Sequence, residues 1–130
     1  MVVDTSALVA IVFGEDDFER FARAIAGDPD AKVSAVSAVE ASIVVESRRG
    51  PDALRDLQTV IEACRAGIGP VDAEQVRDAV GAWRRFGKGR HPAGLNLGDC
   101  FAYALAKSLG ETLLFKGEDF RQTDIASALD

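Results

Sequence analysis

The stretch that decides the fold is Met1-Val2-Val3-Asp4-Thr5-Ser6-Ala7-Leu8, a short apolar strand followed directly by a helix. We expect the strand over residues 1–4 and the helix over Thr5–Phe13. An aspartate at the end of a buried strand is costly unless a cation or hydrogen-bond donors compensate for its charge. Asp4 is therefore the N-cap of the helix, a ligand, or both.

Strands and helices alternate along the rest of the chain. Helical spacing and Gly/Pro breaks predict further helices over residues 15–26, 37–49, 52–66, 72–86 and 96–109. Strands are expected over residues 32–35, 70–71 and 112–115, with loops over residues 87–95 and 116–119. This alternation predicts a single domain over residues 1–130, an α/β fold whose parallel sheet carries helices on both faces.

The spacing of apolar residues also predicts which of them face the core. We expect Val76, Val80 and Trp83 to face the core. The stripe of Leu54, Leu57 and Ile61 is either core or a groove for a helix of another protein. The two cysteines, Cys64 and Cys100, are expected to be core thiols without a disulfide.

Composition favours a cytoplasmic protein without a membrane segment. Hydrophobic residues make up 48% and charged residues 28% of the chain. No apolar run approaches the roughly 20 residues that span a bilayer, and no export signal is expected. The net charge of -6 argues against a simple nucleic-acid-binding protein and suits one that gathers carboxylates around a cation or binds a basic partner.

A parallel sheet binds its ligands outside the carboxyl ends of its strands, and acidic residues lie close to the predicted strands there. They are Asp4, Glu40, Asp99 and Asp119, which only folding can bring together. A hard divalent cation would relieve their repulsion, and carboxylate oxygens suit Mg²⁺ or Mn²⁺. The single histidine, His91, and the absence of a Cys-x-x-Cys pair give little support to zinc.

Each acid also has a structural explanation. Ser37 and Glu40 have the spacing of a capping box. Asn96 is placed to cap a helix whose first turn contains Asp99, where a negative charge is favourable. Asp119 could cap the segment that follows it. A capping acid can still bind a metal ion, so the two interpretations are compatible.

Four segments, in order, resemble the motifs of PIN-domain ribonucleases of the VapC type, which are toxins of toxin–antitoxin pairs. They are residues 2–8, residues 37–40, Leu95-Asn96-Leu97-Gly98-Asp99-Cys100-Phe101-Ala102-Tyr103-Ala104, and Leu113-Leu114-Phe115-Lys116-Gly117-Glu118-Asp119-Phe120. The resemblance implies a PIN-like three-layer α/β/α sandwich and Mg²⁺- or Mn²⁺-dependent cleavage of RNA. It also implies a homodimer that a cognate VapB-type antitoxin inhibits.

By position, the resemblance makes Asp4 and Asp99 metal ligands, with Glu40 and Asp119 completing the catalytic quartet. It makes Ser6 the hydroxyl that supports Asp4, and further supporting roles fall to Asn96 and Glu118. The expected reaction is an in-line attack of water on phosphorus, and one or two ions remain possible.

The fourth segment departs from the family pattern Thr-x-Asp-x-Asp-Phe because Gly117 replaces the first acid. The fourth carboxylate is then Asp119 or Glu118, with Asp124 as a remote third option.

A cluster of basic residues lies within residues 84–91 of an otherwise acidic chain. We expect Arg85, Lys88 and Arg90 to contact RNA phosphates, which bind cations without regard to sequence. The alternative is a solvated loop whose arginines balance the C-terminus of the preceding helix.

Other functions fit the sequence less well. A phosphatase of the dehalogenase type needs a second aspartate two residues after the first, where this chain has Ser6. A phosphorylation-receiver domain needs an early acidic pair and an acceptor aspartate on a middle strand, and neither is evident. The remaining alternative is a catalytically silent PIN-like module that only binds another protein.

Overall fold

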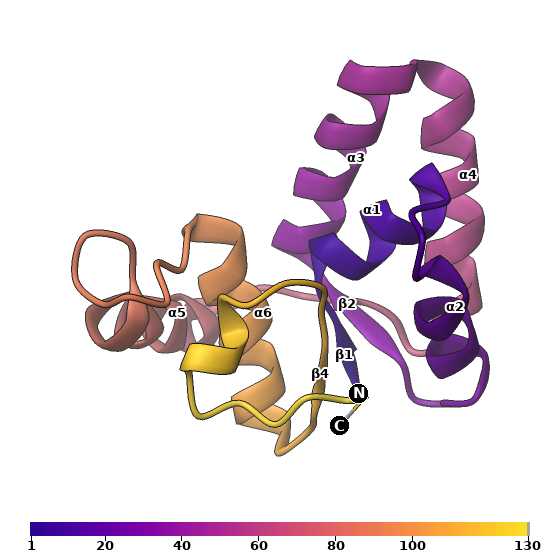
Figure 1. The fold of residues 1–130 in the computed structure, drawn as a ribbon. Helices are drawn as coiled ribbons and strands as arrows, with labels where there is room; N and C mark the ends of the chain where they lie inside the picture. Colours follow the sequence, from indigo (N-terminus) through magenta and orange to yellow (C-terminus); the bar gives the residue numbers. More distant parts are fainter. Residues whose placement is uncertain (130) are drawn as a thin grey trace.

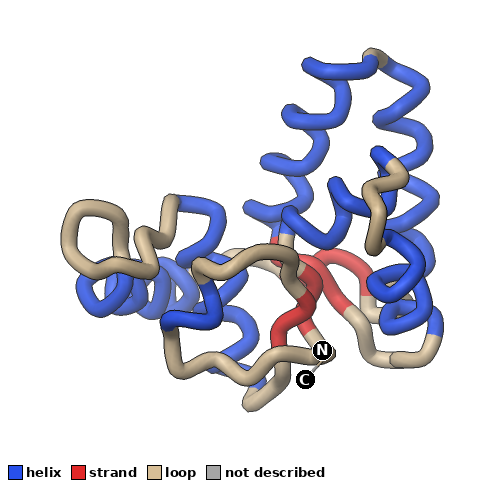
Figure 2. The backbone as a smooth tube through the Cα atoms, in the orientation of Figure 1, coloured by secondary structure: helices blue, strands red, loops and turns tan. Residues whose placement is uncertain are grey.

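The computed structural model describes residues 1–129, and its centre is a parallel sheet with the strand order β3-β2-β1-β4. The strands are β1 (Val2–Val3), β2 (Lys32–Ser34), β3 (Gly67–Gly69) and β4 (Leu113–Leu114). Val2 pairs with Lys32 on one side and with Leu113 on the other. Figure 2 shows these short strands between two groups of helices.

The helices form a layer on each face of the sheet (Figure 1). One layer contains α1 (Thr5–Phe13), α2 (Phe18–Ala26), α3 (Ala35–Arg49) and α4 (Pro51–Ala63), and the other contains α5 (Ala73–Phe86) and α6 (Leu97–Leu109). A single turn of 3-10 helix, η1 (Phe120–Gln122), follows β4. The predicted three-layer α/β/α sandwich is confirmed.

The alternation of side chains along β1 separates two hydrophobic cores. Val2 packs in the core beneath α5 and α6, whereas Val3 packs in the core beneath α1 to α4, and both are fully buried. Such alternation follows from the pleat of a strand. Asp4, the next residue, leaves the sheet where the two layers meet.

Two helices begin two or more residues away from their predicted starts. Gly14 ends α1 in the left-handed conformation (φ 61°), and the chain then turns before α2 begins at Phe18 rather than at residue 15. Helix α3 begins at Ala35, after an extended Ser34, and the predicted capping box of Ser37 and Glu40 is wrong. Ser37 lies buried inside the helix, and its hydroxyl has no hydrogen-bond partner within residues 1–129.

The third strand and the end of the preceding helix also differ from the prediction. Helix α4 ends at Ala63, and the strand is Gly67–Gly69 instead of residues 70–71. Its backbone pairs with Lys32, Val33 and Ser34 of β2, although glycines flank its single side chain. This edge strand is therefore held by backbone pairing.

Helix α5 turns its alanines inward instead of its valines. Ala79, Ala82 and Phe86 are buried, whereas Val80 and Trp83 are 41% and 43% exposed. The prediction that Val76, Val80 and Trp83 face the core is therefore wrong. Small alanines let α5 lie close to α6, and the larger side chains remain on the surface.

The other apolar predictions are confirmed. Leu57 is fully buried, and Leu54 and Ile61 pack against the same core. Cys64 and Cys100 are buried free thiols. Within residues 1–129, we find no helix with the length and hydropathy needed to cross a membrane.

Candidate active site

Asp4 both caps a helix and presents a buried carboxylate. Its Oδ2 accepts hydrogen bonds from the backbone N–H of Ser6 (3.0 Å) and from the Ser6 hydroxyl (2.6 Å). Its Oδ1 is buried and has no hydrogen-bond partner within residues 1–129. Burial raises the pKa of Asp4, and the charge of Glu40 adds to this effect, although the Ser6 hydrogen bonds act against it. A buried, unpartnered carboxylate oxygen of this kind is an atom that a bound ion or water would satisfy.

A short chain of hydrogen bonds connects Asp4 to the end of β4. The backbone N–H of Lys116 donates to the Ser6 hydroxyl oxygen (2.9 Å), and that hydroxyl donates to Asp4. The backbone N–H of Asp4 in turn donates to the carbonyl of Leu114 (2.9 Å). The first and fourth motif segments are thus joined, and the predicted supporting role of Ser6 has a structural basis.

Asp99 lies in the first turn of α6 and forms a reciprocal capping box with Asn96. The Asn96 N–H donates to the Asp99 carboxylate (3.0 Å), and the Asp99 N–H donates to the Asn96 side chain (2.9 Å). Burial raises the pKa of Asp99 from 3.8 to about 7, with further contributions from Asp4, Glu40 and Asp119. Asp99 is therefore close to the other acids in electrostatic terms, and the cap fixes its position.

Glu40 comes from α3 and lies against the start of α6. A Cβ atom placed on Gly98 would be 2.5 Å from Glu40 Oε1, so this carboxylate lies directly against Gly98 and would have to shift if a larger residue stood there. Because α3 begins at Ala35, Glu40 lies beyond the first turn and its carboxylate is not engaged in a cap. It therefore remains available to the site.

These acids line one pocket with a volume of about 410 Å³. Its walls are formed by Asp4, Thr5, Ser6, Val9, Glu15, Glu40, Val44, Arg48, Asn96, Asp99 and Lys116. Across residues 1–129, no three acidic, histidine or cysteine side chains stand close enough together to form a ready-made metal cage. Mg²⁺ commonly uses one or two carboxylates and fills its remaining positions with water. The buried Asp4 and the neighbouring Asp99 fit that arrangement.

The three options for the fourth acid differ in their surroundings. Asp119 is exposed at the start of η1 and does not line the pocket, but its charge contributes to the raised pKa of Asp99. The Glu118 side chain is 83% exposed and lies 3.8 Å from Arg121. Asp124 pairs with Tyr103, Arg85 and Lys107. Asp119 is thus the option that shares the electrostatics of the site.

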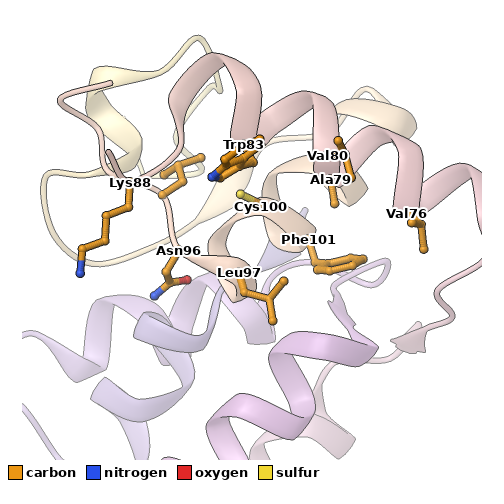
Figure 3. A pocket seen from close by; sticks show the side chains of 10 residues that line it. Val76, Ala79, Val80, Trp83, Lys88, Asn96, Leu97, Cys100 and Phe101 are labelled. Atoms are coloured by element: carbon orange, nitrogen blue, oxygen red, sulfur yellow. The ribbon is translucent and has the colours of Figure 1, made fainter. Parts of the chain in front are cut away.

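The predicted RNA-contacting residues lie outside the acidic pocket. Arg85 contacts Tyr103 and Asp124, and the Arg90 guanidinium lies 4.7 Å from the centre of the Trp83 ring. Lys88 borders a separate apolar groove that also reaches Asn96, as Figure 3 shows. Contact of Arg85, Lys88 and Arg90 with RNA stays a prediction.

Two basic residues that the sequence did not single out do line the pocket: Arg48 and Lys116. Arg48 follows Glu40 and Val44 at intervals of four residues, so one stripe of α3 faces the pocket. That spacing is the signal that could have identified Arg48, once Glu40 was placed on the helix. Lys116 lies within the fourth motif segment, two and three residues before the acids Glu118 and Asp119.

Comparison with known proteins agrees with this site. The sequence model of the PIN domain matches residues 1–126. The chain is 52% identical over 127 residues to "Ribonuclease VapC" of Mycolicibacterium smegmatis, covering 98% of both chains. It is 48% identical over 127 residues to "Ribonuclease VapC30" of Mycobacterium tuberculosis, covering 98% of this chain and 97% of the relative. The chain therefore belongs to the PIN-domain family, in the branch of the VapC ribonucleases.

Solved structures support the same fold. The structure of Mycobacterium tuberculosis VapC20, described as a sarcin-ricin loop cleaving toxin, superposes with a TM-score of 0.78 at 19% identity and covers 96% of this chain and 95% of its own. A chain of a toxin–antitoxin complex from Klebsiella pneumoniae gives a TM-score of 0.71 at 14% identity, with 95% and 92% covered. The resemblance inferred from the four segments is confirmed.

Proposed function

We propose that this protein is the toxin of a toxin–antitoxin pair and hydrolyses RNA phosphodiester bonds at the acidic pocket with Mg²⁺ or Mn²⁺. The observation that carries the proposal is the buried Asp4 carboxylate, with one unpartnered oxygen, in the same pocket as Asp99. Relatives that align over almost the whole chain are named ribonucleases, which supports RNA as the substrate. A cytoplasmic location follows from that substrate.

In this proposal, Asp4 and Asp99 hold the ion, while Glu40 and Asp119 position water. A bound divalent ion would lower the pKa of a coordinated water and stabilise negative charge on a phosphate oxygen. The two hydrogen bonds from Ser6 fix the Asp4 carboxylate and favour its charged form. With a pKa of about 7, Asp99 keeps its proton in weakly acidic solution. It must lose this proton before it can bind the ion.

The test compares Asp4→Asn and Asp99→Asn with an Asp56→Asn control on the exposed side of α4. Both site variants should lose RNA cleavage and remain folded by circular dichroism, and the control should cleave normally. Chelation should abolish cleavage by the unmodified protein, and Mg²⁺ or Mn²⁺ should restore it. Cleavage that persists in either site variant or in the presence of chelator would refute the mechanism. A metal-loaded protein that binds an antitoxin but cuts no RNA would instead be a silent PIN-like module.

We also propose a homodimer that buries an apolar surface formed by α3, α5 and the start of α6. Val39, Ile43 and Leu97 on this surface are 60%, 61% and 73% exposed. Leu97 belongs to two adjoining grooves, one along α3 and one along α5, and Figure 3 shows it beside the groove that Trp83 borders. Contiguous apolar surface of this kind is characteristic of protein interfaces.

Sedimentation velocity tests the homodimer. Ile43→Asp and Leu97→Asp should shift the protein towards a monomer. Leu109→Asp is the matched control, since this exposed leucine lies outside both grooves. A dimer that survives both substitutions would place the interface elsewhere.

The second partner that we propose is a VapB-type antitoxin. The names of the relatives and the toxin–antitoxin complex among the solved structures support it. Growth arrest on expression that Asp4→Ala relieves, and that co-expression of a VapB-type antitoxin also relieves, would test the pairing.

A further inference from the structure

Two positive side chains stand at the edge of a pocket that is otherwise acidic. Arg48 and Lys116 are its only basic lining residues within the described part of the chain, residues 1–129. RNA has to bring a negatively charged backbone to this pocket, where Asp4, Glu40 and Asp99 would repel it. Cations at the edge are therefore of direct interest for substrate binding.

Lys116 belongs to the site through both its backbone and its side chain. Its N–H holds the Ser6 hydroxyl that bonds to Asp4, which fixes the position of its Cα beside the carboxylates. Its ammonium lies 2.7 Å from Glu15 Oε1 and 2.9 Å from Asp17 Oδ1, in the turn between α1 and α2. These three side chains are about one-third exposed, so the ammonium can exchange a carboxylate for another anion.

Arg48 is at the far end of the stripe of α3 that faces the pocket. It lies eight residues after Glu40, which places it about 12 Å further along the helix axis. Its guanidinium is 5.9 Å from the centre of the Phe13 ring, and it makes no ion pair within residues 1–129. The neighbouring Arg49 lies closer to the same ring (4.2 Å) and does not line the pocket.

We propose that Arg48 and Lys116 form a phosphate-binding rim, which holds RNA backbone phosphates on either side of the one that is cut. This inference rests on the proposed ribonuclease function. The backbone of Arg48 lies about 12 Å beyond that of Glu40 along α3, and we therefore assign its guanidinium to a neighbouring phosphate rather than to the scissile one. Lys116 passes from Glu15 and Asp17 to a phosphate when RNA binds.

The competing explanation is that Lys116 is only a clamp between β4 and the turn after α1. The two explanations make opposite predictions for its partners. If Lys116 is a clamp, neutralising Glu15 and Asp17 should weaken RNA binding, as removal of the lysine does. If it binds phosphate, the same change frees the ammonium and removes two charges that repel RNA, so binding should become tighter.

The experiment measures binding of a short fluorescein-labelled single-stranded RNA of mixed sequence by anisotropy, over a range of salt concentrations. Every protein carries Asp4→Asn so that the RNA is not cut. Each lost phosphate contact should reduce the slope of log K against log salt by about 0.7, which corresponds to about fourfold weaker binding at 0.15 M salt. We expect this of Arg48→Ala and Lys116→Ala, and about fifteenfold weaker binding of the double variant.

Three further variants make the result specific. Lys116→Arg should retain binding because it keeps the charge. Arg77→Ala, an exposed arginine of α5 away from the acidic pocket, is the control and should not change the slope. Glu15→Gln combined with Asp17→Asn should tighten binding.

The rim is refuted if Arg48→Ala and Lys116→Ala keep the full salt slope, or if the Glu15 and Asp17 double variant binds RNA more weakly. Either outcome would leave the ribonuclease function intact, provided that the protein without Asp4→Asn cleaves RNA. If that protein neither binds nor cleaves RNA, the proposed function itself fails.

Discussion

Asp99→Asn should make the metal-free protein more stable, although it removes a residue of the active site. The folded protein raises the pKa of Asp99 to about 7 because the carboxyl group is buried near other acids, compared with an ordinary value of 3.8. The folded state therefore holds this proton more tightly than the unfolded state does. Stability contributed by the protonated group is lost as the pH rises from 3.8 to 7.

The two pKa values set the size of the effect. The cost of ionised Asp99 is about 4 kcal/mol above pH 7, at about 1.36 kcal/mol per pKa unit. Because Asp99 is partly exposed, solvent screening reduces this to about 2 kcal/mol. Asparagine carries no charge, and its oxygen can still accept the hydrogen bond from the Asn96 N–H. At pH 5 the gain should fall to about 1 kcal/mol, because Asp99 of the folded, unmodified protein is then largely protonated and carries little charge.

Urea unfolding in EDTA at pH 5 and pH 8 measures this difference. Asp56→Asn serves as the control and should change the free energy of unfolding by less than about 0.5 kcal/mol. An Asp99→Asn protein that is no more stable than the unmodified one at pH 8 would refute the reasoning. A gain of the same size at both pH values would also refute it, because the stabilisation would then not arise from the charge.

Three other predictions follow from the contacts of the site and of the C-terminal segment. Ser6→Ala should destabilise the protein by about 2 kcal/mol in urea unfolding, because Asp4 and the Lys116 N–H each lose a hydrogen-bond partner, and RNA cleavage should fall with it. Equal stability and activity would show that the hydroxyl is dispensable. Tyr103→Phe should cost about 1 to 2 kcal/mol through loss of its bond to Asp124 while leaving RNA cleavage intact, and a loss of cleavage without a loss of stability would contradict this structural role. Saturating Mg²⁺ should stabilise the unmodified protein by about 3 kcal/mol at a hundred times its Kd, and it should have little effect on Asp4→Asn, as followed by thermal unfolding.

The order of elements and the acidic pocket could be predicted because each depends on local signals. Apolar spacing placed the helices, and glycines marked where α1, α3 and α6 end. The motif segments placed Asp4, Glu40 and Asp99, which the fold brings into one pocket. These features survive small errors in helix boundaries.

The misplaced elements depend on contacts that the sequence does not show. Strand β3 consists of Gly67, Ile68 and Gly69, whose composition suggests a break, and only pairing with β2 makes it a strand. Helix α5 has alanines and valines on two faces with the same spacing, so periodicity cannot say which face α6 covers. Arg48 and Lys116 are far apart in the sequence and form no local basic cluster, so only the fold, which brings them together from α3 and the loop after β4, reveals them.

The separation of the two cores at β1 has a consequence for how the molecule opens. Asp4 and Asp99 come from opposite layers, one from the start of α1 and the other from the start of α6. An ion held by both would stabilise only conformations in which the layers stay together. Amide hydrogens of α1 and of α6, which could exchange with solvent through independent local openings in the free protein, would then exchange through one shared opening. Occupancy of the active site would thus change the cooperativity of the fold as well as its stability.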